Sequence, residues 1–241
     1  MIQAEGIFAG GATKPYIEET YDSYDNLIDV KMHGYTKIRD DAFSGCNNLA
    51  LTSLPDDIVS IGAGAFLNCL SLAITSLPDG LMSIGGEAFY NCPNLALTSL
   101  PDGLTSIGGY AFDSCESLAL TALPDGLTSI EPGTFNNCPN LALTSLPDGL
   151  TSIGGYAFDS CESLALTSLP DGLTSIGRYA FGGCTGLTSL TFMGTPTSIA
   201  SDAFEGCENL TTINVPWAEG AVEGAPWGAA NATIHYNYTG G

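Results

Sequence analysis

Apolar positions recur along most of this chain with a fixed period of 23 residues. Isoleucine, phenylalanine and cysteine each follow this period through eight copies without an insertion. One 23-residue unit is too short to bury its own apolar side chains, so the period predicts a solenoid whose turns stack their equivalent residues. The phenylalanines are Phe43, Phe66, Phe89, Phe112, Phe135, Phe158, Phe181 and Phe204, and the cysteines are Cys46, Cys69, Cys92, Cys115, Cys138, Cys161, Cys184 and Cys207.

Each repeat divides into short segments of different character, as in residues 95–117, LALTSLPDGLTSIGGYAFDSCES. The run LALTSLP is apolar and ends at a proline, which is typical of a short strand. PDG is a turn sequence, and LTSI is a second extended piece that glycines end. Phe112, Cys115 and Leu118 are spaced by three, which predicts the inward face of a short helical or 3₁₀ turn.

The chain therefore predicts a repeat solenoid: a right-handed coil of about eight turns, built mainly of short parallel β-strands. The open ends of such a coil need caps. Residues 1–34 predict an N-terminal β-hairpin around the turn sequence DSYDN, and residues 35–216 form the solenoid. Residues 217–241 predict a C-terminal cap, in which Trp217 and Trp227 close the core and ATIHYNY forms a last strand.

The repeat unit, for example LTSIGGYAFDSCESL or LTSIGRYAFGGCTGL, resembles the BspA-type leucine-rich repeats of bacterial surface antigens and some protist surface proteins. The resemblance covers about residues 35–216 and implies a leucine-rich-repeat coil. The flanking sequences also resemble those around such repeats in prophage tail-region proteins of gut Firmicutes. The middle copies read LALTSL where the family pattern is L-x-x-L-x-L, as in LTSLTF and LTTINV near the end of the array.

The charge is strongly one-sided, with 26 Asp and Glu against 5 Lys and Arg and a net charge of −21. All basic residues except Arg178 precede Asp40. This balance argues against nucleic acid and anionic membranes as partners, and it suits either a basic partner or simple solvation. We find no membrane-spanning run and no signal-peptide pattern, and expect no membrane insertion.

Candidate chemistry is sparse. No two cysteines lie closer than 23 residues, which excludes the paired spacing of zinc sites, and we expect reduced, buried thiols rather than disulfides. Both histidines, His33 and His235, lie outside the array, so no nucleophile has a histidine partner there. We expect no enzyme activity, no cofactor and no metal, although two carboxylates of a glycosidase could be found in so acidic a chain.

Two further columns of residues remain open to interpretation. The aspartates of the PDG turns either form solvated turns or bridge calcium: Asp56, Asp79, Asp102, Asp125, Asp148 and Asp171. The third position of LALTSL is either core, if a bulge shifts the register, or an exposed apolar binding stripe. Its members are Leu51, Ile74, Leu97, Leu120, Leu143 and Leu166.

The repetition favours a non-enzymatic, adhesion-like module that binds a protein or a glycan through many similar contacts. Residues 91–121 and 137–167 are identical, so a two-turn block has been duplicated, and duplication multiplies contacts. The alternative is a rigid structural spacer in a phage tail or a cell-surface assembly. Both interpretations favour a cell-surface, secreted or phage-associated location.

Overall fold

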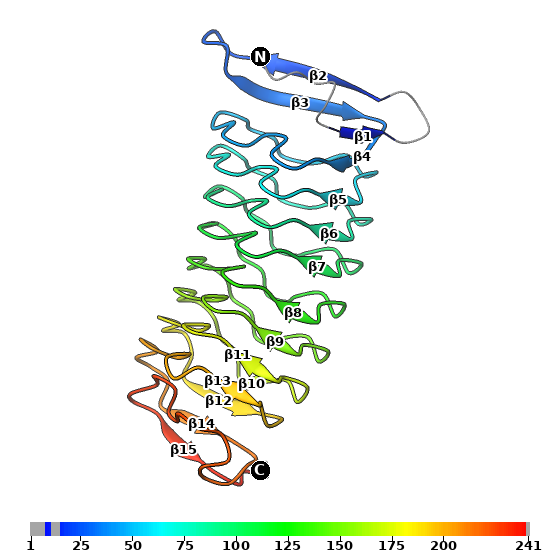
Figure 1. The fold of residues 1–241 in the computed structure, drawn as a ribbon. Coiled ribbons are helices and arrows are strands. Elements are labelled where there is room, and N and C mark those ends of the chain that lie inside the picture. Colours follow the sequence, from blue (N-terminus) through cyan, green and yellow to red (C-terminus); the bar gives the residue numbers. More distant parts are fainter. Residues whose placement is uncertain (1–7, 11–14, 240–241) are drawn as a thin grey trace.

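The computed structural model describes residues 8–10 and 15–239, most of which stack as successive turns of an elongated parallel β-solenoid (Figure 1). The bounds of its strands are β1 Phe8–Gly10, β2 Tyr16–Tyr21, β3 Leu27–His33, β4 Tyr35–Ile38, β5 Ser60–Ile61, β6 Ser83–Ile84, β7 Ser106–Ile107, β8 Ser129–Ile130, β9 Ser152–Ile153, β10 Ser168–Leu169, β11 Ser175–Ile176, β12 Ser189–Phe192, β13 Ser198–Ile199, β14 Thr212–Asn214 and β15 Thr233–His235.

The LTSI segment forms the parallel sheet that runs along the solenoid. Within a sheet, neighbouring turns pair their Ser-Ile dipeptides in register, as Ser60 with Ser83 and Ile61 with Ile84, and Lys37-Ile38 takes this place in the first turn. The sheet is interrupted once, because β4 to β7 belong to one sheet and β8, β9, β11 and β13 to another. Glu131 and Pro132 follow β8, where the turns directly before and after have Gly-Gly.

The LALTSL segment forms a continuous ladder only near the C-terminal end, where β10, β12, β14 and β15 pair in parallel. In the earlier copies one backbone hydrogen bond joins each turn to the next, as from Ala96 N to Ile74 O at 3.2 Å. The buried positions explain the difference. LALTSL buries its first, third and sixth residues, whereas LTSLTF buries its first, fourth and sixth. Only LTSLTF, in its last three residues, shows the alternation of buried and less buried side chains that is typical of a strand.

The YAFDSC segment forms separate 3₁₀-type turns rather than a helix, and no helix occurs in residues 8–10 or 15–239. Within one turn, Cys115 N donates to Phe112 O and Leu118 N to Cys115 O. Tyr110 and Ser114 have positive φ, which stops helix propagation, and their N–H groups donate to the following turn. The predicted inward face of Phe112, Cys115 and Leu118 is nevertheless correct, since all three are fully buried.

The phenylalanine column forms the centre of the core. All eight phenylalanines of the period have at most 1% of their surface exposed. Consecutive rings stack with centroids 5.1–5.6 Å apart and nearly parallel planes. This spacing is close to the separation of neighbouring β-strands, so identical side chains can stack without changing the backbone.

Both ends of the solenoid are covered. At the N-terminal end, β2 and β3 form an antiparallel hairpin whose Leu27, Val30 and Met32 are buried (Figure 1). At the C-terminal end, Trp217 and Trp227 are buried against Phe192, with ring centroids 5.3 and 6.0 Å away. The sequence ATIHYNY contributes β15, which is shorter than predicted.

Candidate binding surface

Of the two interpretations of the third LALTSL position, the exposed binding stripe is wrong, because these residues belong to the core. Leu51 and the five equivalent residues Ile74, Leu97, Leu120, Leu143 and Leu166 have at most 4% of their surface exposed. The threonines that follow them, such as Thr98 and Thr144, are exposed instead. A one-residue shift of register turns a side chain to the opposite face, and the shifted register buries more apolar area.

The cysteines form a column of free thiols beside the phenylalanines. Seven are buried, and Cys46 of the first turn is half-buried. Each buried thiol donates a hydrogen bond to the backbone carbonyl of the phenylalanine 26 residues earlier, at 2.9–3.1 Å. Burial raises the pKa of these thiols, that of Cys138 to about 12, so they stay protonated and act as structural donors.

The aspartate column lies on exposed turns, from Asp56 to Asp171, of which the first reads PDD and the other five PDG. Hollows between successive turns run past these residues, one lined by Asp56 and Asp79 and another by Asp148 and Asp171. In the part of the chain that the structure describes, no three His, Cys, Asp or Glu side chains lie together as metal ligands would. The column presents repeated negative charge at one edge of the solenoid.

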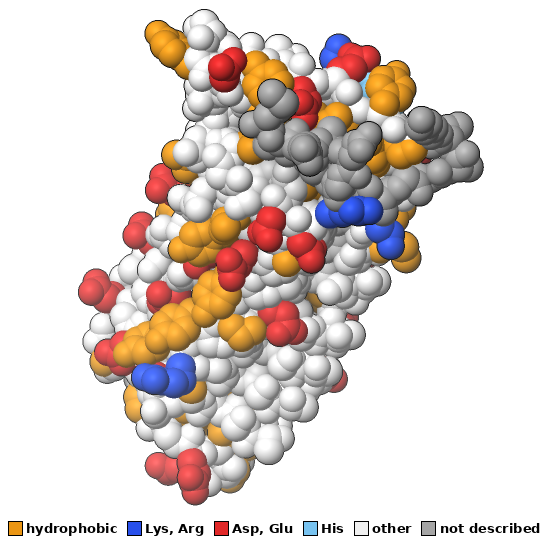
Figure 2. Space-filling view, turned by 45° about the horizontal axis from the view of Figure 1, so that its top comes forward, with side chains coloured by type: hydrophobic (Ala, Val, Ile, Leu, Met, Phe, Trp, Pro, Cys, Tyr) orange, Lys and Arg blue, Asp and Glu red, His pale blue; other side chains and the backbone are white. Residues whose placement is uncertain are grey.

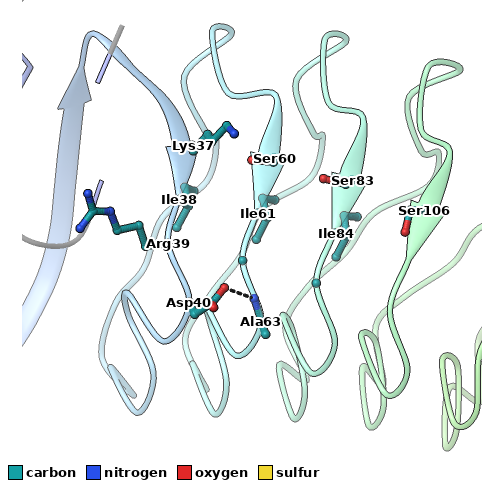
Figure 3. A pocket seen from close by; sticks show the side chains of 12 residues that line it. Lys37, Ile38, Arg39, Asp40, Ser60, Ile61, Ala63, Ser83, Ile84 and Ser106 are labelled. Atoms are coloured by element: carbon teal, nitrogen blue, oxygen red, sulfur yellow. Dashed lines mark hydrogen bonds between the residues drawn. The ribbon is translucent and has the colours of Figure 1, made fainter. Parts of the chain in front are cut away.

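An open groove of about 700 Å³ runs along strands β4 to β7 (Figure 3). Ser60, Ser83 and Ser106 line it in a row, and Lys37 and Arg39 lie at its first turn. Asp40 Oδ1 accepts a hydrogen bond from Ala63 N at 2.9 Å and so joins the first two turns. The groove is shallow and follows the sheet, which differs from the enclosed pockets that hold small substrates.

Sequence reasoning missed a row of tyrosines two residues before the core phenylalanine, a position that holds tyrosine in three of the eight repeats. Tyr110 and Tyr156 have 39% and 40% of their surface exposed, and the half-buried Tyr179 stacks on Tyr156 with ring centroids 5.4 Å apart. We call Tyr110, Tyr156 and Tyr179 the tyrosine strip. Figure 2 shows a face on which hydrophobic side chains form a row across the solenoid, with acidic side chains beside it.

The backbone of the tyrosine strip is left-handed, with φ of 57° at Tyr110, 59° at Tyr156 and 51° at Tyr179. The same position holds Gly64 and Gly133 in other turns, also at positive φ. A Cβ atom on Gly133 would overlap the ring of Tyr110, so that ring lies over the glycine. Bulky residues are rare in this conformation because the Cβ atom crowds the following carbonyl oxygen.

Arg178 lies at the C-terminal end of the tyrosine strip. Its guanidinium carbon is 5.6 Å from the ring centroid of Tyr179. Nε and Nη2 of the same group lie 2.9 and 2.8 Å from Oδ2 of Asp202, which occupies the tyrosine position of the next turn. A cation is thus held between an aromatic ring and a carboxylate of two successive turns.

The two histidines lie at opposite ends of the solenoid, in β3 and β15. His33 stacks on Tyr16 with ring centroids 4.3 Å apart, and its Nε2 is 3.7 Å from Glu18 Oε1. Neither residue reaches a nucleophile of the array. Over the described ranges, there is no helix able to cross a bilayer.

The sequence matches the family model of the BspA type leucine rich repeat region, over residues 36–165 and 151–219. Among solved structures, it is similar to a leucine rich repeat protein from T. pallidum, at 25% identity and a TM-score of 0.54, over 80% of this chain and 87% of that one. A leucine-rich repeat protein from Bacteroides ovatus is 21% identical with a TM-score of 0.51, over 91% of this chain and 75% of that one. A search of curated proteins found no match. The period, the stacked core and the matching residues together show that this chain belongs to the BspA type leucine-rich repeat family.

Proposed function

We propose that this protein is a non-enzymatic, adhesion-type binding module that holds a partner protein with a basic surface against its repeated acidic face. The observation that carries the proposal is the exposed aspartate column, which repeats one carboxylate in each of six consecutive turns. Beyond Arg39, Arg178 is the single Lys or Arg of the sequence. Such a surface attracts cationic partners over a long range.

Repetition supports binding as well as rigidity. Solenoids of this kind offer an extended surface whose contacts recur from turn to turn. The identical blocks 91–121 and 137–167 double whatever contact one block makes. Two weak contacts on one rigid body gain avidity, because the second contact forms at a high effective concentration.

The test is a version that lacks residues 91–136, which joins Tyr90 to Asn137 and removes 46 residues, or two whole turns, in register. Both proteins would be measured by biolayer interferometry against purified host matrix proteins, mucins and a glycan array. We expect saturable binding to a basic protein, weakened roughly tenfold or more by the deletion. Equal binding by both versions would contradict the proposal.

A different outcome would favour the structural spacer. If both versions stay folded by circular dichroism and neither binds any probe, the stacked core would serve only to hold the ends of the chain apart. Electron microscopy with an antibody against the protein would then locate it on the cell surface or on phage particles. A surface or phage location is part of our proposal, and a cytosolic signal alone would contradict it.

A further inference from the structure

We propose that the tyrosine strip, together with the carboxylate of Asp159, is a docking site for an arginine-containing basic segment of a partner protein. The inference rests on the proposed function and adds to it the site and the chemistry of the partner. The left-handed backbone conformation is unfavourable for a bulky residue such as tyrosine. Three tyrosines occupy a left-handed position that the fold also fills with glycine, so the fold itself does not require a ring there.

The residue types found at the position of the tyrosine strip suit the binding of a cation. From turn to turn the position holds Asp41, Gly64, Glu87, Tyr110, Gly133, Tyr156, Tyr179 and Asp202, which are only acids, glycines and tyrosines. The face of a tyrosine ring attracts ammonium and guanidinium groups, and a neighbouring carboxylate adds a charged hydrogen-bond acceptor. Neutral sugars would gain from the rings but not from the surrounding negative charge.

The chain already contains one example of this recognition. Arg178 places its guanidinium over Tyr179, donates a hydrogen bond from Nε to Oδ2 of Asp202 and forms an ion pair with the same oxygen through Nη2. Its side chain is 68% exposed, so little besides these two groups holds it. An arginine from a partner would find a comparable pair of groups at Tyr156 and Asp159. Tyr179 stacks on one face of the Tyr156 ring, yet Tyr156 is 40% exposed, and the equivalent of Arg178 in its turn is Gly155.

Asp159 supplies the carboxylate for that second position. A Cβ atom on Gly182 would overlap Oδ1 of Asp159 and lie 3.3 Å from Cβ of Tyr179, which places the carboxylate beside the strip. No side chain in the described ranges donates a hydrogen bond to it. The duplicated residue Asp113 differs, because Asn136 Nδ2 and Ser114 Oγ donate to its carboxylate at 2.9 and 2.7 Å. Burial also raises the pKa of Asp159, and a bound cation would relieve that cost.

The experiment measures the affinity of a fluorescent peptide of alternating arginine and glycine by anisotropy, at about 0.15 M salt. Peptides with lysine or uncharged citrulline in place of arginine are the ligand controls. The main variant is Y110G/Y156G/Y179G, because Gly64 and Gly133 show that glycine suits this position. The control variant is Y238A, because Tyr238 is an exposed tyrosine of the C-terminal cap, outside the strip. A second variant, D102N/D125N/D148N, removes three charges from the PDG turns and measures how much of the affinity comes from the aspartate column.

We expect the arginine peptide to bind best and the citrulline peptide not to bind. The triple tyrosine variant should lose roughly tenfold or more in affinity, and the PDG variant less than about threefold. R178G should bind the arginine peptide more tightly than wild type, because it opens Tyr179 and Asp202 to the ligand. Glycine is already present at the equivalent positions 86, 109 and 155.

Other results would overturn the inference. If the tyrosine variant binds as wild type does while the PDG variant loses affinity, the acidic face binds cations without the strip, and only the proposed function stands. If a neutral oligosaccharide binds and the tyrosine variant abolishes that binding, the strip is a glycan site. If wild type binds no arginine peptide, the inference fails, and the deletion of residues 91–136 still tests the proposed function against whole proteins.

Discussion

At the scale of single residues, the cysteine column has a direct chemical test. Seven thiols are buried and donate to a carbonyl, and burial raises their pKa values, to about 12 at Cys92 and Cys207. Burial also raises the pKa of Cys46, but this thiol is only half-buried and makes no such bond in the described structure, so a reagent can reach it. Only a thiolate reacts with a disulfide reagent such as DTNB. We expect one thiol per chain to react in the native protein at about pH 8, and all eight after unfolding in guanidinium without reductant. Rapid native reaction of several thiols would contradict the buried column.

Asp113 and Asp159 form a second test, because identical sequence blocks place them in different surroundings. Burial raises the pKa of Asp159, so the folded state holds its proton more tightly than the unfolded state. The stability contributed by this group therefore falls as pH rises through the raised pKa. We expect D159N to unfold at an equal or higher temperature than wild type at neutral pH, and the difference to vanish below about pH 4.

The matched control for this prediction is D113N. The Asp113 carboxylate accepts hydrogen bonds from Asn136 and Ser114. In D113N, an NH₂ group replaces one of the two accepting oxygens and would face a hydrogen-bond donor. We expect its unfolding temperature to fall by a few degrees, as for the loss of about 1 kcal/mol in hydrogen bonding. A higher unfolding temperature for D113N, or a lower one for D159N at neutral pH, would contradict this prediction. It would show that contacts with the neighbouring turn do not determine whether each aspartate stabilises the fold.

At the scale of elements, the C-terminal cap makes a stability prediction. Trp227 is fully buried, its Nε1 donates to Glu223 O at 2.7 Å, and its ring lies 6.3 Å from that of Trp217. Replacing it with alanine should lower the free energy of unfolding by about 3–5 kcal/mol, because the last turn of the core would open. Guanidinium unfolding followed by circular dichroism measures this. Y238A, in an exposed residue of the same cap, should change it by less than about 0.5 kcal/mol.

The elements also show what the sequence could predict. The 23-residue period was enough to predict the solenoid and the buried phenylalanine and cysteine columns, because identical residues stack from turn to turn. The turn sequence DSYDN predicted the hairpin of β2 and β3, because a hairpin depends on local pattern. The strand assignment of LALTSL was only partly correct, since it forms ladder strands near the C-terminal end alone. The buried positions of LALTSL, the first, third and sixth, fit neither a strand nor a helix. Burial of apolar side chains across the whole turn decides which register this segment adopts.

At the scale of the molecule, the candidate surface was not predictable from pattern alone. The tyrosine strip is not periodic, since Gly133 interrupts it and Asp202 ends it, and a search for columns of identical residues passes over it. Its signal lies in the left-handed backbone and in the contact with Arg178, which only the folded chain shows. The sequence predicts the core columns because the same residue recurs there in every turn. The tyrosine strip is not predicted because it depends on residues that differ from one turn to the next.

The charge of the whole molecule should affect stability and binding in opposite directions. Six exposed aspartates stack one turn apart in a chain of net charge −21, and like charges about 5 Å apart repel by roughly 0.8 kcal/mol in water. Salt screens this repulsion, so we expect the unfolding temperature to rise between about 0.05 and 0.5 M NaCl. D102N/D125N/D148N should unfold at a higher temperature at low salt and respond less to added salt. Over the same range the affinity for the arginine peptide should fall, because screening weakens the attraction between opposite charges. An unfolding temperature that does not change with salt would mean that solvent already screens the column, and that its aspartates act as turn formers alone.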